Sequence, residues 1–286
     1  MNTIRVGLLA AVAGLATLSS ETTLAAEGGA SGYLQGTYND FAVAIASPPG
    51  YYLRNDLFYY AATVGARPLG GQVDLGVSQQ VWGNLLKFAC MSDITILGGA
   101  YGAAIVLPVV LDASATGSIG IGATSVERQG GTSGIGDVFL QPFQLYWTQG
   151  NQHFAFTPGI VIPTGGYDKD RLLNTGRNYW SFDLAGSYTW LHPQRGHEIS
   201  FTPGVLFNGR NSDTDYRTGN EFHLDWTVAQ HFSESFAIGL TGYWYEQITG
   251  DSGQLPAGFD AGDFKSSGVG VGVAALYSTQ IGSEDV

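Results

Sequence analysis

Hydrophobic and polar positions alternate with a period of two along most of the chain beyond residue 50. In residues 199–207 one face carries Ile199, Phe201, Val205 and Phe207, and the other carries Ser200, Thr202 and Gly204. The stretches 154–162 and 222–228 repeat this pattern. A period of two is typical of β-strands with two different faces. The small and polar faces fit the lumen of a membrane barrel, although the alternation alone is also compatible with a soluble β-sandwich.

The lengths of the connections separate these two folds. We expect strands near residues 51–66, 72–87, 94–111, 134–147, 153–163, 178–190, 197–208, 221–230, 235–247 and 267–279. From the third strand onward, long connections (112–133, 164–177, 209–220 and 248–266) alternate with short ones (148–152, 191–196 and 231–234); the connection 67–71 is an exception, short where a long one is due. Outer-membrane barrels have this asymmetry. The sequence therefore predicts an all-β, antiparallel transmembrane β-barrel of about 10–12 strands, with short periplasmic turns and long extracellular loops.

A short repeat falls on two of these strands. The sequence "FTPGI" at 156–160 recurs as "FTPGV" at 201–205, which puts a proline inside each strand. Proline cannot donate to a ladder, so we expect a bulge or kink at both places.

Composition and charge support export to a membrane. Glycine (42 residues) is at about twice its usual share, and the charge is −12 with only 12 basic residues, which argues against a nucleic-acid partner. Residues 1–26 resemble a signal peptide, with Arg5 before an apolar stretch that is too short to span a bilayer. We expect residues 27–50 to be an N-terminal extension or plug, residues 51–286 to be the barrel, and the protein to lie in the outer membrane. The single Cys90 excludes an intramolecular disulfide.

Charged residues within the expected strands are few, and lipid would penalise them. Asp137, Asp183 and Asp225 are expected to face the lumen together with Arg177, and to pair with Arg128, Arg177 or Arg217. Structural ion pairing and a role in solute passage are equally compatible with this pattern.

No motif indicates an enzyme, a metal site or a cofactor. Four of the five histidines are at or beside the expected short turns, and no metal-ligand spacing occurs. His231 is close to Ser233 and Ser235, which leaves an outer-membrane lipid hydrolase as a weak alternative. Most aromatic residues at strand ends are expected at the lipid–water interface, and an aromatic-lined solute path is the alternative.

Three stretches resemble the family of outer-membrane proteins called MetA-pathway of phenol degradation. They are "PTGGYDKDRLLNTGRNYWSFD" (163–183), "GIGDVFLQP" (134–142) and "PPGYY" (48–52), and the resemblance extends from about residue 33 to 279. The motif positions are Pro163, Thr164, Gly165, Tyr167, Asp168, Asn174, Gly176, Asn178 and Trp180. They belong to the expected loop 164–177 and its flanks, and none is expected to be catalytic.

The resemblance implies a barrel that helps hydrophobic aromatic compounds cross the outer membrane. We therefore expect a passive channel whose partners are the lipid bilayer, small hydrophobic or aromatic molecules and the barrel-assembly machinery. A non-transport barrel, filled by side chains or by a plug, is the main alternative. Such barrels usually have twelve strands and a terminal aromatic residue, whereas this sequence ends in "TQIGSEDV". We expect that C-terminal strands are missing from it, or that fewer strands close the barrel.

Overall fold

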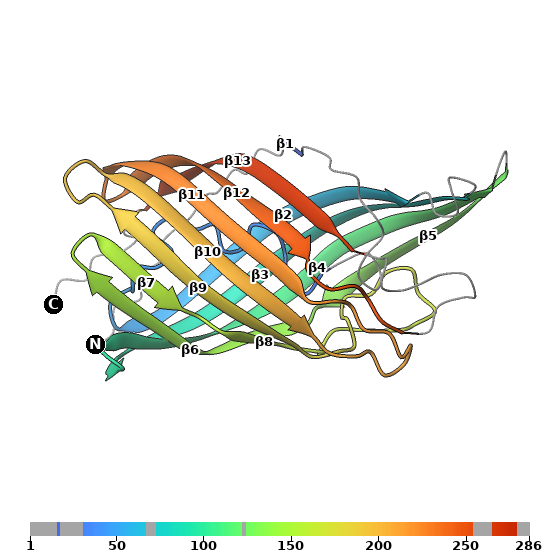
Figure 1. Cartoon of the computed structure of the whole chain (residues 1–286), viewed down its shortest axis with the longest axis horizontal. Helices are drawn as coiled ribbons and strands as arrows, with labels where there is room; N and C mark the ends of the chain where they lie inside the picture. Colours follow the sequence, from blue (N-terminus) through green and yellow to red (C-terminus); the bar gives the residue numbers. More distant parts are fainter. Residues whose placement is uncertain (1–15, 18–30, 67–72, 122–123, 254–264, 279–286) are drawn as a thin grey trace.

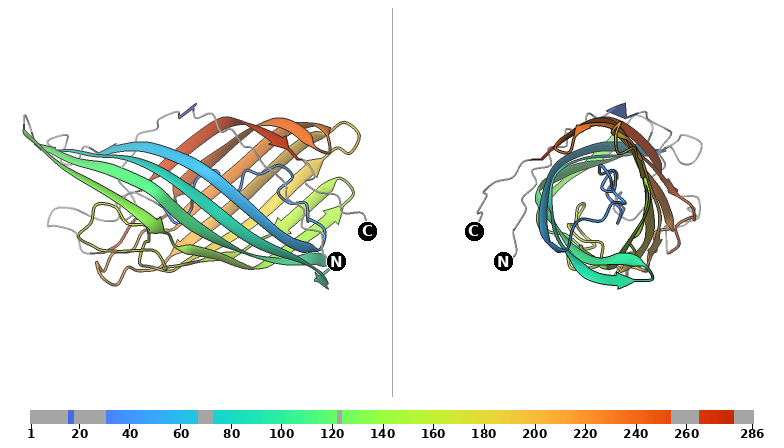
Figure 2. Two further views of the ribbon diagram at one scale, coloured as in Figure 1. Left: turned by 180° about the vertical axis from the view of Figure 1, so that it is seen from behind. Right: turned by 90° about the vertical axis from the view of Figure 1, so that its left-hand side faces the viewer.

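Thirteen strands form one antiparallel sheet in the computed structural model of the chain, which describes residues 16–17, 31–66, 73–121, 124–253 and 265–278. The sheet curls into a barrel, seen along its axis in Figure 2 and from the side in Figure 1. The strands are β1 (Ala16–Thr17), β2 (Gly50–Ala66), β3 (Val73–Ile96), β4 (Gly99–Ile121), β5 (Thr124–Ile135), β6 (Val138–Gln149), β7 (Gln152–Phe156), β8 (Gly159–Ile162), β9 (Ser181–Leu191), β10 (His197–Asn208), β11 (Glu221–Ser233), β12 (Phe236–Gln247) and β13 (Ser267–Tyr277). The predicted antiparallel all-β barrel is confirmed.

Two of the wall strands are interrupted. β5 and β6 both pair with β4. β7 and β8 both pair with β6 on one side and with β9 on the other, so each interrupted strand follows one path along the wall. If each pair is counted once and the two-residue β1 is left out, ten strands form the wall. They follow the ten ranges expected from the sequence. Within the described residues, no ladder joins β2 to β13.

The repeated prolines explain local gaps in the ladders. Pro158 lies in the break between β7 and β8, where the Thr157 amide still donates to the Ala185 carbonyl at 3.0 Å. Pro203 leaves β10 continuous, but the ladder to β9 skips from Phe201 to Gly204. Each proline is thus at a gap in a ladder, and at Pro203 the gap is on the β9 side only and involves no shift of register.

The prediction of a long loop at 112–133 is wrong. β4 and β5 continue through this region as a hairpin that protrudes from the barrel together with the ends of β2 and β3 (Figure 1, right). β4 has 23 residues, whereas about 9–11 suffice to cross a bilayer. Residues 112–121 do alternate between small or apolar and polar side chains, but residues 124–134 are mostly polar or glycine, so the sequence does not indicate a second strand to pair with them. The same extension explains why a short connection suffices near residue 67.

The two faces of the wall differ in polarity in the way a lipid environment requires. On β10, Ile199, Phe201 and Phe207 are exposed on the outside, while Ser200 and Thr202 are buried inside. β9 and β11 follow the same rule. Burial is therefore inverted relative to a soluble sheet, with apolar side chains outward and polar ones inward. Among the described residues, no helix is long and apolar enough to cross a membrane.

Candidate functional site: the barrel lumen

Residues 31–49, here called the N-terminal segment, lie inside the barrel (Figure 2, right). The segment runs from the end with long loops, where the Arg177 guanidinium donates to the Ser31 carbonyl at 3.2 Å, to the end with short turns, where β2 begins at Gly50. It makes its hydrogen bonds mainly with the polar inner faces of β9, β10 and β11.

Two tyrosines of the segment are bonded to carboxylates of the wall. Tyr33 donates to Asp225 at 2.5 Å, and Tyr38 donates to Asp183 at 2.7 Å. Burial first, and then the nearby Asp225 carboxylate, raises the pKa of Tyr33 well above that of an ordinary phenol. Burial and Asp183 do the same to the pKa of Tyr38. Both phenols therefore stay protonated and act as donors.

His223 joins the two tyrosines into one buried group. Its Nε2 lies 3.0 Å from Asp183 Oδ1, and its ring stacks on Tyr33 with a centroid distance of 4.2 Å. The Tyr38 ring lies parallel at 5.4 Å. Gly204 leaves room for this imidazole, since a Cβ at that position would lie 2.3 Å from Nε2. The group holds the middle of the segment against β9–β11.

The end of the segment near the short turns is held by a second group. The Ala42 amide donates to Glu198 at 2.6 Å, and the other oxygen of that carboxylate lies 2.5 Å from His231 Nε2. The Ala44 amide donates to Thr189 at 3.2 Å. His231 therefore contacts a carboxylate, while Ser233 and Ser235 contact each other at 3.2 Å. This is not the serine–histidine pair that the hydrolase alternative requires.

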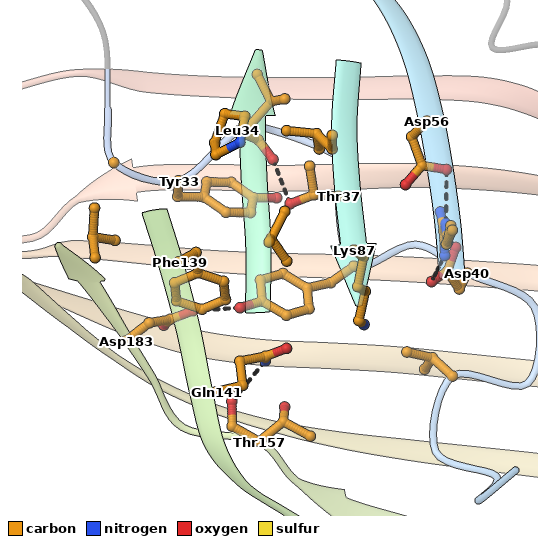
Figure 3. Close-up of a pocket in the computed structure, with 18 of the residues that line it drawn as sticks. Tyr33, Leu34, Thr37, Asp40, Asp56, Lys87, Phe139, Gln141, Thr157 and Asp183 are labelled. Atoms are coloured by element: carbon orange, nitrogen blue, oxygen red, sulfur yellow. Dashed lines mark hydrogen bonds and ion pairs between the residues drawn. The ribbon is translucent and has the colours of Figure 1, made fainter. Parts of the chain in front are cut away.

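A cavity of about 450 Å³ remains between the N-terminal segment and the opposite wall (Figure 3). Its apolar lining includes Phe58, Val106, Phe139 and Tyr146 from β2, β4 and β6. Phe139 packs against Gly159, where a Cβ would come within 2.1 Å of the ring. Tyr146 thus borders the interior, and Tyr179 and Tyr245 are buried, so these three are not among the strand-end aromatic residues at the lipid–water interface.

The loop 163–180 folds over the mouth and is anchored at the break between β5 and β6. Asp137, at this break, accepts from the Gly165 amide at 2.9 Å and from the Arg177 amide at 2.7 Å. The two arms of the loop touch through glycines, since a Cβ on Gly165 would lie 2.6 Å from Gly176 Cα. This contact gives a physical reason for both glycines and for the Asp137 carboxylate.

The other motif residues shape the same loop. The amide group of Asn174 bonds the Asp168 backbone at both ends, at 2.9 and 3.0 Å. Asn178 has a left-handed φ of 62° and donates to Asn211 at 2.8 Å. The remaining motif residues make backbone or loop contacts: Thr164 with Val138 and Gly136, Tyr167 with Asn211, and the Trp180 carbonyl with Gly209. Pro163 directly follows β8, and the Trp180 side chain is exposed.

The four residues assigned to the lumen from the sequence all border the interior. Asp183 and Asp225 are buried beside the N-terminal segment, and Asp137 and Arg177 line the cavity. The carboxylates of Asp183 and Asp225 bond to His223 and the two segment tyrosines, residues that the sequence does not indicate as their partners. Asp137 accepts from the backbone amide of Arg177.

Several site residues could not be identified from the sequence. Tyr33 and Tyr38 lie in a segment without periodicity, and His223 looks like one polar residue on an alternating strand. The signal in the sequence is Asp225, which lies two residues further along β11 and therefore on the same inward face as His223. Within the described residues, no group of three His, Cys, Asp or Glu side chains is arranged to hold a metal ion.

The outward apolar face and the polar, partly occupied lumen define a transmembrane β-barrel protein. The chain belongs to the family described as "Putative MetA-pathway of phenol degradation", whose model matches residues 65–283. It is similar in structure to an outer membrane channel from Pseudomonas putida F1, with a TM-score of 0.55 and 16% sequence identity; the match covers 84% of this chain and 99% of that one. No curated protein matches the sequence.

Proposed function

We propose that this protein is a passive outer-membrane channel for small hydrophobic, aromatic compounds. The observation that carries the proposal is the cavity of about 450 Å³ inside the barrel, lined by aromatic and aliphatic side chains of the wall. Pockets of this size and polarity hold small apolar ligands. The family description and the outer membrane channel with the same fold support it. The proposal includes the outer membrane bilayer and the barrel-assembly machinery as partners, and no enzymatic activity, cofactor or nucleic acid.

The test is growth on limiting phenol or toluene in cells that lack the gene and other hydrophobic channels. Complementation with the wild-type gene is expected to restore uptake of the labelled compound. A Val106→Trp variant is expected to restore it poorly, because the indole would fill the cavity that Val106 lines. Ile105→Trp is the matched control, since the neighbouring Ile105 side chain is exposed on the outer face. Equal uptake by the deletion strain and the complemented strain would refute the channel.

A second candidate is a non-transport barrel that stabilises the envelope. The observation that favours it is the N-terminal segment, which is bonded along the lumen from Ser31 to Ala44. This candidate expects unchanged uptake in the deletion strain together with increased sensitivity to detergents and bile salts.

A further inference from the structure

Seven charged side chains line the cavity, and all but one of them are engaged within the protein. The seven are Asp40, Arg54, Asp56, Lys87, Asp137, Arg177 and Asp183. Arg54 bonds both Asp40 and Asp56, the latter at 2.7 Å. The carboxylates of Asp137 and Asp183 and the guanidinium of Arg177 have the partners described above.

Lys87 is the exception. Within the part of the chain that the structure describes, its ammonium makes no hydrogen bond and no ion pair. Lys87 is on β3, opposite Arg54 on one side and Val106 on the other, and both of these residues also line the cavity. Its side chain extends from the wall into this space (Figure 3). Lys87 is half-buried in this cavity, and an oxygen of a ligand can accept a charge-assisted hydrogen bond from its ammonium.

The surroundings of Lys87 fit a ring better than an extended chain. Phe58, Val106, Phe139 and Tyr146 provide flat or branched apolar surface around the same cavity. A cavity of about 150 Å³ already holds benzene, so 450 Å³ accommodates one aromatic ring with its substituents. The two glutamines of the lining are bonded to each other at 3.0 Å and are less available to a ligand.

We propose that Lys87 is the polar anchor of a binding site for small aromatic compounds that carry a hydroxyl or a carboxylate. The ring packs against the apolar lining, and the ammonium donates to the oxygen of the ligand. A hydrocarbon such as toluene fills the same space without this bond. The inference rests on the proposed function, because it names the compounds that the channel cavity selects.

Binding to the purified protein in detergent tests the site without requiring passage across a membrane. Titration calorimetry with phenol, benzoate and toluene is expected to give at least about tenfold tighter binding of one or both oxygen-bearing compounds than of toluene, as a bond to a charged donor provides. Lys87→Met keeps the length of the side chain and is expected to remove this preference, with toluene affinity changed less than about twofold. The separate phenol and benzoate arms distinguish a hydroxyl from a carboxylate.

Two further variants serve as controls for Lys87→Met. Lys87→Arg keeps the cation and is expected to retain the preference, while Lys169→Met removes an exposed lysine of the loop and is expected to have no effect. If Lys87→Met does not fold, Lys87→Arg and the comparison of the three compounds on the wild-type protein still test whether the cavity prefers compounds with an oxygen. Equal affinity for phenol, benzoate and toluene in the wild type, or a preference that survives in Lys87→Met, overturns the Lys87 site alone. Absence of binding by all three compounds counts against the channel proposal as well.

Discussion

Replacing Asp137 by alanine is expected to release the loop 163–180 from the mouth of the barrel. The carboxylate accepts two backbone N–H groups, from Gly165 at 2.9 Å and from Arg177 at 2.7 Å, one on each arm of the loop. A hydrogen bond to a charged group contributes about 1.5 kcal/mol at the low end of its range, which suits a half-buried carboxylate. The loss of both bonds lowers the free energy of local opening by about 3 kcal/mol. This corresponds to a roughly hundredfold larger equilibrium constant for local opening of the loop.

Amide hydrogen exchange followed by mass spectrometry measures this change directly, because the two N–H groups are themselves reporters. Exchange in the peptide that covers 163–180 is expected to accelerate about a hundredfold in Asp137→Ala, while strand peptides keep their protection. Asp170→Ala is the control: its side chain is exposed, and within the described residues its carboxylate makes no hydrogen bond or ion pair, so exchange is expected to change less than about threefold. Exchange in Asp137→Ala as slow as in the wild type would refute the role of this carboxylate.

Two other predictions concern the buried group inside the barrel. Gly204→Ala places a Cβ 2.3 Å from His223 Nε2 and is expected to lower the free energy of unfolding in urea by about 1–3 kcal/mol. In the control Gly186→Ala the new Cβ meets nothing closer than 3.4 Å, so the free energy of unfolding should fall much less. Equal losses of stability in the two variants would contradict this packing. The raised pKa of Tyr33 and of Tyr38 means that the folded state holds more protons above about pH 10, so the stability they contribute is complete below that pH and falls as the pH rises. At pH 11 the double variant Tyr33→Phe/Tyr38→Phe is therefore expected to show the same tyrosinate absorbance as the wild type, and two fewer ionised phenols in the variant would disprove it.

The sequence predicts the membrane-crossing part of the wall well because lipid imposes a rule on each strand. The outward position must be apolar and the inward one small or polar, as Phe201 and Thr202 are, so the period of two reveals both the strand and its faces. The rule weakens where the strands leave the lipid. Residues 112–121 of β4 still alternate, but residues 124–134 of β5 are mostly polar or glycine, so the sequence predicts a loop for the whole hairpin.

The candidate site is less predictable because its contacts are distant along the chain. The loop glycines and Asp137 are recognisable as a motif, but their mutual contact joins residues about 40 positions apart. Tyr33 meets Asp225 across 192 positions, and nothing local in either stretch encodes the pairing. The unpartnered state of Lys87 depends on Arg54, opposite it on β2, bonding both Asp56 of the same strand and Asp40 of the distant N-terminal segment.

The position of the N-terminal segment constrains the order in which the protein folds. The segment precedes every long strand of the wall, yet its partners Glu198 and Asp225 are on β10 and β11, late in the chain. It cannot take its place until those strands have formed a surface to receive it. Contacts of such separation slow folding, because a long loop must close before they form. Insertion of the N-terminal segment is therefore a late event in assembly, and the barrel passes through a stage in which its lumen does not yet contain this segment.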